Sequence, residues 1–162
     1  MKTQISALTV LTLLACSSVT GASEERELSS KEVPQPVHEA FQKAYPAAKA
    51  FKYEEESADG KSAYEVKFKD QGKKIDVLYS ADGALIETEE HIKISELPEA
   101  VIKVIKKEHP HAKLKEAEKI IKPDGTIRAY EVEFTSEKKQ LELEIDTSGV
   151  ILKTKTEEKE KD

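Results

Sequence analysis

Apolar residues recur at helical spacing in one short segment of each half of the chain. The stripe that includes Val37 and Phe41 predicts a helix over residues 34–44. The stripe that includes Val101 predicts a second helix, for which Ser95 is the expected N-terminal cap. Each helix has only about three turns, so we expect both to be stabilised by packing on a sheet.

Elsewhere in each half, apolar and polar residues alternate with a period of two, which is typical of half-buried strands. Residues 64–68 read Tyr-Glu-Val-Lys-Phe, and residues 130–134 read Tyr-Glu-Val-Glu-Phe. The dipeptides Asp-Gly at 82–83 and Ser-Gly at 148–149 predict tight turns. Each helix is therefore expected to be followed by four strands with hairpin connections.

The two halves are copies of one unit. Pro34 matches Pro98 at a shift of 64 residues, and Gly83 matches Gly149 at a shift of 66. A unit of about 60 residues is small for independent stability, which favours a shared core or a continuous sheet. The predicted fold class is α+β, with two tandem α-β-β-β-β repeats. They form an antiparallel sheet with helices on one face and the other face exposed to solvent.

The segment before the repeats predicts export. Residues 5–15 form an apolar run that follows Lys2, too short to span a bilayer and of the right length for a secretory signal peptide. Cys16 follows Leu-Leu-Ala, which resembles a bacterial lipobox, and the cysteine would then be lipidated. In the alternative, an ordinary signal peptidase cleaves near residue 22 and removes Cys16. The sequence leaves both alternatives open.

Composition divides the chain into five parts. We expect a signal peptide over 1–22, a flexible tether over 23–31, repeats over 32–90 and 91–153, and a disordered charged tail over 154–162. The formal net charge of −6 argues against binding to nucleic acid or to anionic lipid. A lipid on the cysteine is the expected membrane anchor if there is one. The repeats contain no cysteine, which excludes disulfides from them.

Helix-end and turn residues carry a resemblance to a known family. They are Val33-Pro34, Tyr45-Pro46-Ala47-Ala48-Lys49, Asp59-Gly60, Tyr64-Glu65-Val66, Asp82-Gly83, Ile94-Ser95-Glu96-Leu97-Pro98 and His109-Pro110. Over about residues 33–153 the chain resembles the PepSY-like, beta-lactamase-inhibitor-like family. The resemblance implies a secreted or envelope bacterial protein with tandem α-β4 units, no established enzymatic role, and an activity in protein binding or inhibition. It supplies no functional residues.

The strongest candidate binding surface is acidic and lies on the outward positions of two predicted strands in the second repeat. It consists of Glu131, Glu133, Glu142, Glu144 and Asp146. One interpretation is the ordinary solvated face of a one-sided sheet. The other is a docking surface for a cationic protein, or a loose calcium site built from carboxylate oxygens.

Other polar residues form no recognisable site. His109 and His111 are separated by a proline, and one half-buried and one solvated histidine are expected; metal binding by the pair is the alternative. His38 and His91 are far from any cysteine in the sequence and lack metal-ligand spacing. The glutamates at 54–56 and 89–90 are interpreted as solvated strand ends. We expect no catalytic residues, no metal site and no cofactor.

The sequence therefore predicts an exported, monomeric, non-catalytic protein of the bacterial envelope. Its expected activity is protein binding, or inhibition by analogy with the family, through the open face of the sheet. Its partner is an unknown envelope protein. The alternative function is periplasmic binding or sensing of a metal or small cation.

Overall fold

The computed structural model describes residues 26–49, 51–58 and 60–157, so the predicted signal peptide and Cys16 lie outside the described residues. The elements in chain order are β1 (Arg26–Leu28), α1 (Gln35–Ala44), β2 (Phe51–Ala58), β3 (Lys61–Asp70), β4 (Lys73–Ser80), β5 (Leu85–His91), a 3₁₀ turn η1 (Ile94–Glu96), α2 (Glu99–Glu108), β6 (Lys113–Ile121), β7 (Ile127–Ser136), β8 (Lys139–Asp146) and β9 (Ile151–Glu157). None of the helices in this part of the chain is long and apolar enough to span a membrane.

All nine strands belong to one sheet, and their order in space is their order in the chain. Each strand is antiparallel to its neighbours, so short hairpin connections suffice within a repeat. The repeats join where β5 pairs with β6, in the register Thr88 to Ile121 and His91 to Glu118. The prediction of tandem helix-and-four-strand repeats in an antiparallel α+β fold is confirmed, and the sheet is continuous across the repeat boundary.

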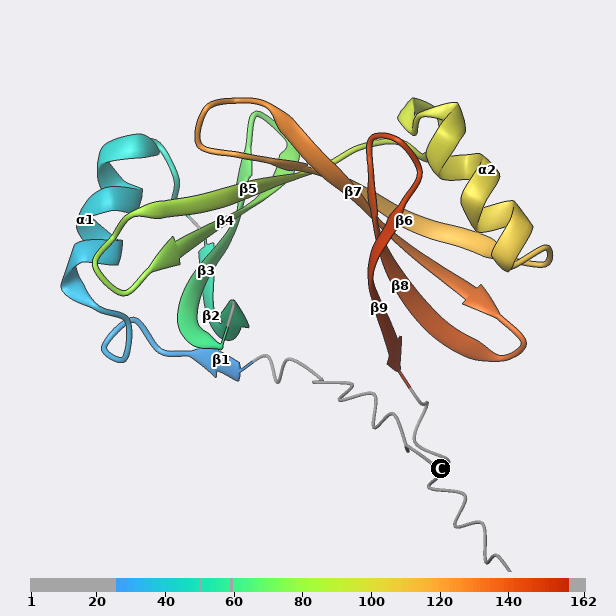
Figure 1. The fold of residues 1–162 in the computed structure, drawn as a ribbon. Helices are drawn as coiled ribbons and strands as arrows, with labels where there is room; N and C mark the ends of the chain where they lie inside the picture. The colour runs from blue at the N-terminus through green and yellow to red at the C-terminus, as the bar shows by residue number, and fades with distance from the viewer. Residues whose placement is uncertain (1–25, 50, 59, 158–162) are drawn as a thin grey trace, which may run out of the picture.

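The two helices pack on the same side of the sheet, one over each repeat (Figure 1). Val37 and Phe41 of α1 are buried against the first repeat's strands, and Val101 and Ile105 of α2 against the second's. The buried residues form two separate apolar clusters, one under each helix. Full burial of one such side chain stabilises the fold by about 1.5–3 kcal/mol. Each repeat therefore has its own core, while the sheet is shared.

Both helices begin directly after a proline, and this displaces the predicted cap of the second helix. Pro34 and Pro98 are the N-terminal capping residues. A residue before proline is driven to extended backbone, and Leu97 has φ −63° and ψ 137°. Ser95 therefore lies in the preceding 3₁₀ turn and not at the start of α2. The prediction of Ser95 as the cap is wrong.

An aromatic contact fixes the C-terminal end of each helix to its strands. The ring of Tyr45 lies 4.6 Å from that of Phe68, between centroids. At the equivalent place in the second repeat, the ring of His109 lies 4.9 Å from that of Phe134. His109 is half-buried and His111 is exposed, as predicted.

The last hairpin turn of each repeat supports the first turn of the same repeat's helix. Gly83 has φ +82°, and a Cβ added there would lie 2.5 Å from the carbonyl oxygen of Pro36. Gly149 has φ +93°, and its Cβ would lie 3.2 Å from the carbonyl oxygen of Ala100. Only glycine combines this backbone conformation with so close an approach. The two glycines that carry the repeat signal therefore connect sheet and helix.

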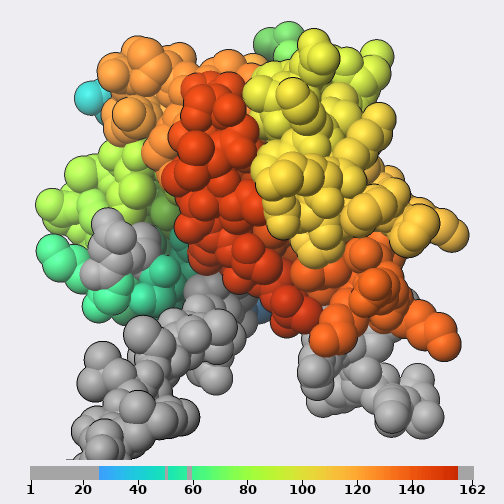
Figure 2. Space-filling model, turned by 45° about the vertical axis from the view of Figure 1, so that its right-hand side comes forward, coloured from blue at the N-terminus to red at the C-terminus, as the bar shows by residue number. Residues whose placement is uncertain are grey.

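The sheet extends into both segments that were predicted to be irregular. Residues 26–28 of the predicted tether form β1, and Arg26 pairs with Glu55 of β2 at 2.8 Å. Residues 154–157 of the predicted tail belong to β9, where Lys155 lies 2.8 Å from Glu142. In Figure 2, β9 runs down the front of the molecule beside α2. Backbone pairing and ion pairs order these polar edge strands, although few of their residues are apolar.

Candidate functional site on the concave face of the sheet

The face of the sheet opposite the helices carries no helix in the described part of the chain, and it is concave. The sheet bends into an arch, with β1–β3 on one side of the hollow and β8–β9 on the other (Figure 1). Glu56 of β2 and Lys153 of β9 line the same cavity of about 140 Å³. The curvature therefore turns the middle of this face, predicted to be open to water, into a partly enclosed polar interior.

Carboxylates dominate this interior, which we call the acidic cavity. Its lining comprises Glu56, Glu65, Asp76, Glu87, Glu89, Glu118, Glu131, Glu142 and Glu144, with Lys67, Lys153 and Lys155. Residues opposite one another in an antiparallel pair point to the same face, and the register places acids side by side. Asp76 lies opposite Glu89, and Glu118 lies opposite Glu131. Like charges in these positions repel one another, so protons or cations must compensate them.

Burial raises the pKa of several of these carboxyl groups and so favours their neutral, protonated form. The pKa of Glu65 is raised to about 8 and that of Glu131 to about 9, in each case mainly by desolvation. Desolvation and the nearby carboxylates Glu131 and Glu118 raise the pKa of Glu89 as well. Leu78 is buried opposite Glu65, and Ile120 is buried opposite Glu89. These apolar neighbours shield the carboxyl groups of Glu65 and Glu89 from water.

His91 supplies positive charge at the repeat boundary. Its Nε2 lies 2.6 Å from Oε1 of Glu118 and 3.9 Å from the carboxylate of Asp76. Asp76 and Glu118 raise the pKa of His91 to about 9. His91 has no metal-ligand spacing in the sequence, and its carboxylate partners come from β4 and β6. The interpretation of Glu89 as a solvated strand end is wrong, because burial desolvates its carboxyl. His38, by contrast, has a structural role, because its Nδ1 accepts a hydrogen bond from the Tyr53 hydroxyl at 2.7 Å.

The five predicted docking residues do not form one uniform acidic patch. Glu131 lines the acidic cavity with Glu142 and Glu144. Glu142 lies 2.8 Å from Lys155, and Glu144 forms an ion pair with Arg128. The other two residues lie elsewhere.

Glu133 lies 3.3 Å from Lys115, outside the lining of the cavity. Asp146 accepts hydrogen bonds from the backbone N–H groups of Ser148 and Val150 at 2.8 and 2.9 Å, which closes the last hairpin turn. Three of the five predicted residues thus form ion pairs within the protein, and Asp146 forms hydrogen bonds within a turn. Their proposed role in docking remains a prediction.

Three overlapping groups of side chains bring potential metal ligands within 4.8 Å of one another. They are Asp76, His91 and Glu118; Glu65, Asp76 and Glu89; and Glu89, Glu118 and Glu131. Carboxylate oxygens suit hard divalent cations, and the histidine nitrogen suits zinc. Among the described residues, none of these groups includes His109 or His111.

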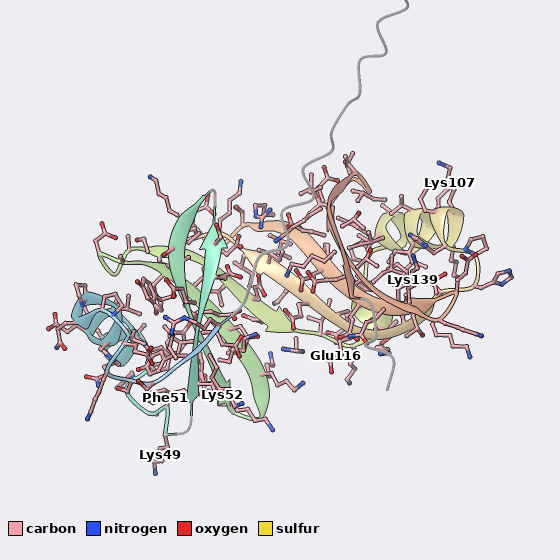
Figure 3. The ribbon with its side chains drawn as sticks, turned by 90° about the horizontal axis from the view of Figure 1, so that it is seen from below. Lys49, Phe51, Lys52, Lys107, Glu116 and Lys139 are labelled. Atoms are coloured by element: carbon pink, nitrogen blue, oxygen red, sulfur yellow. The ribbon has the colours of Figure 1, made fainter. Side chains whose placement is uncertain are left out.

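A larger cleft of about 1030 Å³ opens at one end of the arch, and we call it the lysine cleft. It is lined by Ala47, Lys49, Phe51, Lys52, Lys67, Phe68, Lys69, Lys74, Asp76, His91, Glu116 and Glu118. Lys49, Phe51 and Lys52 group at the first repeat's end of it, and Glu116 lies on the second repeat (Figure 3). The cleft therefore spans the junction of the repeats, and its inner end meets the acidic cavity at Asp76 and Glu118.

The comparisons with known proteins agree with the fold. The family model described as "Putative beta-lactamase-inhibitor-like, PepSY-like" matches residues 21–87 and again residues 62–153. No curated protein matches the chain. Similar solved structures come from Bacteroides species.

A "putative periplasmic" protein from Bacteroides eggerthii superposes with a TM-score of 0.60 at 17% identity, covering 76% of this chain and 88% of that one. A DUF2874 family protein from Bacteroides uniformis gives 0.60 at 18% identity, covering 76% and 89%. A BLIP-like protein from Bacteroides fragilis gives 0.53 at 21% identity, covering 76% and 86%. At these identities the likeness establishes the fold alone.

Proposed function

The chain belongs to the PepSY-like, beta-lactamase-inhibitor-like family, and from this premise we propose that it is a non-catalytic periplasmic module that binds another protein. Two similar structures support the location and the kind of activity, since one is described as a periplasmic protein and another as BLIP-like. The apolar run over residues 5–15 supports export. Protein binding is the activity that a scaffold without an evident reaction centre serves best.

The observation that carries this proposal is the lysine cleft at the junction of the two repeats. With a volume of about 1030 Å³ it is much larger than the acidic cavity of about 140 Å³. The rim of the cleft is exposed, whereas Glu65 and Asp76 beneath it are buried. A partner therefore reaches the concave side through the cleft, because the charged interior behind it is largely filled by its own ion pairs.

Site-specific photo-crosslinking in the native bacterium tests the proposal. A photoreactive amino acid replaces Lys69 or Glu116 in the cleft, and Lys107 or Lys139 outside it as matched controls (Figure 3). We expect positions 69 and 116 to crosslink to a protein of the same mass, and positions 107 and 139 to give no such product. Absence of crosslinks from the cleft, or the same product from the control positions, overturns the proposal.

A second candidate function is cation binding, and the triple of Asp76, His91 and Glu118 favours it. These three side chains combine carboxylate and imidazole ligands within 4.8 Å at the repeat boundary. Competition by the internal cations makes this the weaker candidate, because His91 already pairs with Glu118. Calorimetric titration with calcium and with zinc tests it. Heat that disappears in His91→Gln supports binding at this triple, and no heat at millimolar calcium and micromolar zinc refutes it.

The mode of attachment to the envelope rests on Cys16. We propose that the cysteine is lipidated, since Leu-Leu-Ala precedes it as in a lipobox. Mass spectrometry of the mature N-terminus distinguishes a diacylglyceryl-modified Cys16 from a peptide that begins near residue 22. The second result leaves the protein free in the periplasm.

A further inference from the structure

The lysine cleft differs in charge from the acidic cavity behind it, and this difference identifies the chemistry of its ligand. We infer that the cleft binds a short acidic stretch of the partner's chain, with one apolar side chain packed on Phe51 and flanking carboxylates on the surrounding lysines. This inference rests on the proposed function and specifies its partner. The charge of this partner segment is opposite to that of the cationic partner that the acidic strands of the second repeat suggest.

The exposed lysines of the cleft are available to a partner. Within the part of the chain that the structure describes, Lys49 and Lys69 have no ion pair. Lys52 lies 3.8 Å from Glu27, but both side chains are more than 60% exposed. Lys74 lies 3.7 Å from Glu116, also at the surface. Exposed pairs of this kind are weak, so these lysines are free to bind an anionic partner.

Asp76 and Glu118, two of the three acids of the cleft, are less available than its lysines, and the third, Glu116, is exposed beside Lys74. Glu118 lies 2.6 Å from His91, and the pair is only 13% and 20% exposed. Lys67, at the inner wall, pairs with Glu54 at 2.8 Å and with Glu65 at 3.0 Å. The internal charges thus compensate one another, while the rim keeps an excess of positive charge. Complementary charge at such a rim steers association and selects the partner.

The cleft also contains an exposed aromatic ring that packs against buried rings. Phe51 is 37% exposed, yet its ring lies 5.1 Å from that of Phe41 and 5.3 Å from that of Tyr53, in edge-to-face geometry. Phe68 lines the same cleft and is buried. A ring ordered by neighbours loses little conformational entropy on binding, so apolar contact with it is a net gain. A purely ionic ligand leaves this ring uncovered.

The charge of the cleft changes sign along its length. Lysines occupy the rim, and Asp76 and Glu118 occupy the inner end. A carboxylate is attracted at the rim and repelled farther in. Long polyanions such as nucleic acids would meet both this repulsion and the net charge of −6 of the whole chain. A short acidic segment with an apolar residue at its centre can contact the rim lysines and Phe51 without reaching the inner acids.

Three synthetic peptides test the inference on the exported protein: Ac-Asp-Glu-Phe-Glu-Asp-amide, its analogue with alanine for phenylalanine, and its analogue with lysine for every acid. Binding is followed by chemical-shift changes on the ¹⁵N-labelled protein. We expect the first peptide to perturb residues of the cleft and to bind at least about tenfold more tightly than the lysine analogue. We expect about fivefold weaker binding for the alanine analogue.

Variants of the protein test whether the acidic peptide binds in the lysine cleft. Combined Lys69→Glu and Lys74→Glu should weaken the first peptide at least about tenfold, and Phe51→Ser should abolish its preference over the alanine analogue. Combined Lys107→Glu and Lys139→Glu, which makes the same change in charge away from the cleft, should leave binding unchanged. Equal binding of the acidic and lysine peptides, or equal loss in the control variant, overturns the inference.

The two proposals fail in different ways. If cleft positions crosslink to a protein in cells but the acidic peptide shows no preference over the lysine peptide, protein binding stands and the inferred chemistry is wrong. If the alanine analogue binds as tightly as the first peptide, the apolar part of the inference is wrong. If positions in the cleft give no crosslink, the proposed function itself fails, whatever the peptides do.

Discussion

Nε2 of His91 on β5 lies 2.6 Å from Oε1 of Glu118 on β6, and this ion pair joins the last strand of the first repeat to the first strand of the second. Both side chains are less than one quarter exposed, so the interaction is only partly screened by solvent. Arg128 of β7 adds a second bridge, at 2.8 Å from Glu87 of β5. The boundary between the repeats is therefore held by charge as well as by backbone pairing.

The His91–Glu118 pair should show energetic coupling. We expect His91→Asn to lower the free energy of unfolding by about 1–3 kcal/mol at pH 7, since it leaves a half-buried carboxylate without its cation. In a Glu118→Gln background the same change should cost about 1 kcal/mol less. Urea denaturation of the four proteins measures the coupling.

The control for this cycle is the exposed pair of Lys107 and Glu108 on α2, whose side chains are 77% and 44% exposed. Its coupling should be too small to measure, because solvent screens the two charges. Strict additivity of His91→Asn and Glu118→Gln would show that the ion pair contributes nothing to the junction.

Stability should fall as the pH rises from 6 to above 9. Glu65 and Glu131 have folded-state pKa values of about 8 and about 9 against an ordinary 4.5, and His91 has about 9 against 6.5. Between the ordinary and the raised values the folded state binds more protons than the unfolded state, so the free energy of unfolding decreases with pH. The melting temperature at pH 6 should exceed that at pH 9.

Glu131→Gln removes one of these titrations while keeping a neutral side chain of the same shape. It should reduce the loss of stability between pH 6 and pH 9 by about 1 kcal/mol or more. Glu27→Gln, which makes the same change of charge at an exposed position of β1, is the matched control. A flat profile in the unmodified protein would contradict the burial of these carboxylates.

Substitution of the turn glycines should distinguish backbone conformation from packing. Gly125 has φ +83° with open space where a Cβ would lie, whereas Gly83 has φ +82° with the Pro36 oxygen 2.5 Å from that position. Gly125→Ala should cost about 1 kcal/mol, because alanine is strained in the left-handed conformation. Gly83→Ala should cost at least about 2 kcal/mol, since the turn must also move away from α1. Thermal denaturation compares the two, and equal losses would show that the contact with α1 is not tight.

Deletion of residues 154–162 should destabilise the second repeat, because it removes the outer half of β9. The deletion exposes backbone of β8 that now pairs with β9, from Gln140 opposite Glu157 to Leu143 opposite Thr154. Amide hydrogen exchange should become faster in residues 140–143 and stay unchanged in β3. If exchange in β8 is unaffected, the strand assigned to this charged segment is not stable in solution.

The repeat, the helices and most strands were predictable because their signals are local. Pro46 and Pro110 end helices, Gly83 and Gly149 form turns, and the period-two pattern of residues 64–68 reports which side chains face the core. Strand β1 and the part of β9 from residue 154 on were missed because they contain few apolar residues and owe their order to pairing with a neighbour. No local pattern encodes a pairing partner.

The site was less predictable, because the alternating pattern gives the face of the sheet on which a residue lies but not how far the sheet bends. Glu131, Glu142 and Glu144 were expected on one outward face, and they do lie together. Their partial burial depends on the arch, which brings Glu56 of β2 and Lys153 of β9 to the same cavity. Glu89 and His91 carried a usable signal, since charged residues alternate through β5 where a strand end was expected.

The pairing of β5 with β6 also means that the sheet has no inherent terminus. In the first repeat the outer edge of β5 is occupied by β6, whereas the corresponding edge of β9 in the second repeat has no neighbouring strand in the described part of the chain. A third unit added at β9 would meet the same kind of edge that the second unit met at β5. Further repeats could therefore be added at β9, and each one would extend the curved sheet further around the acidic cavity.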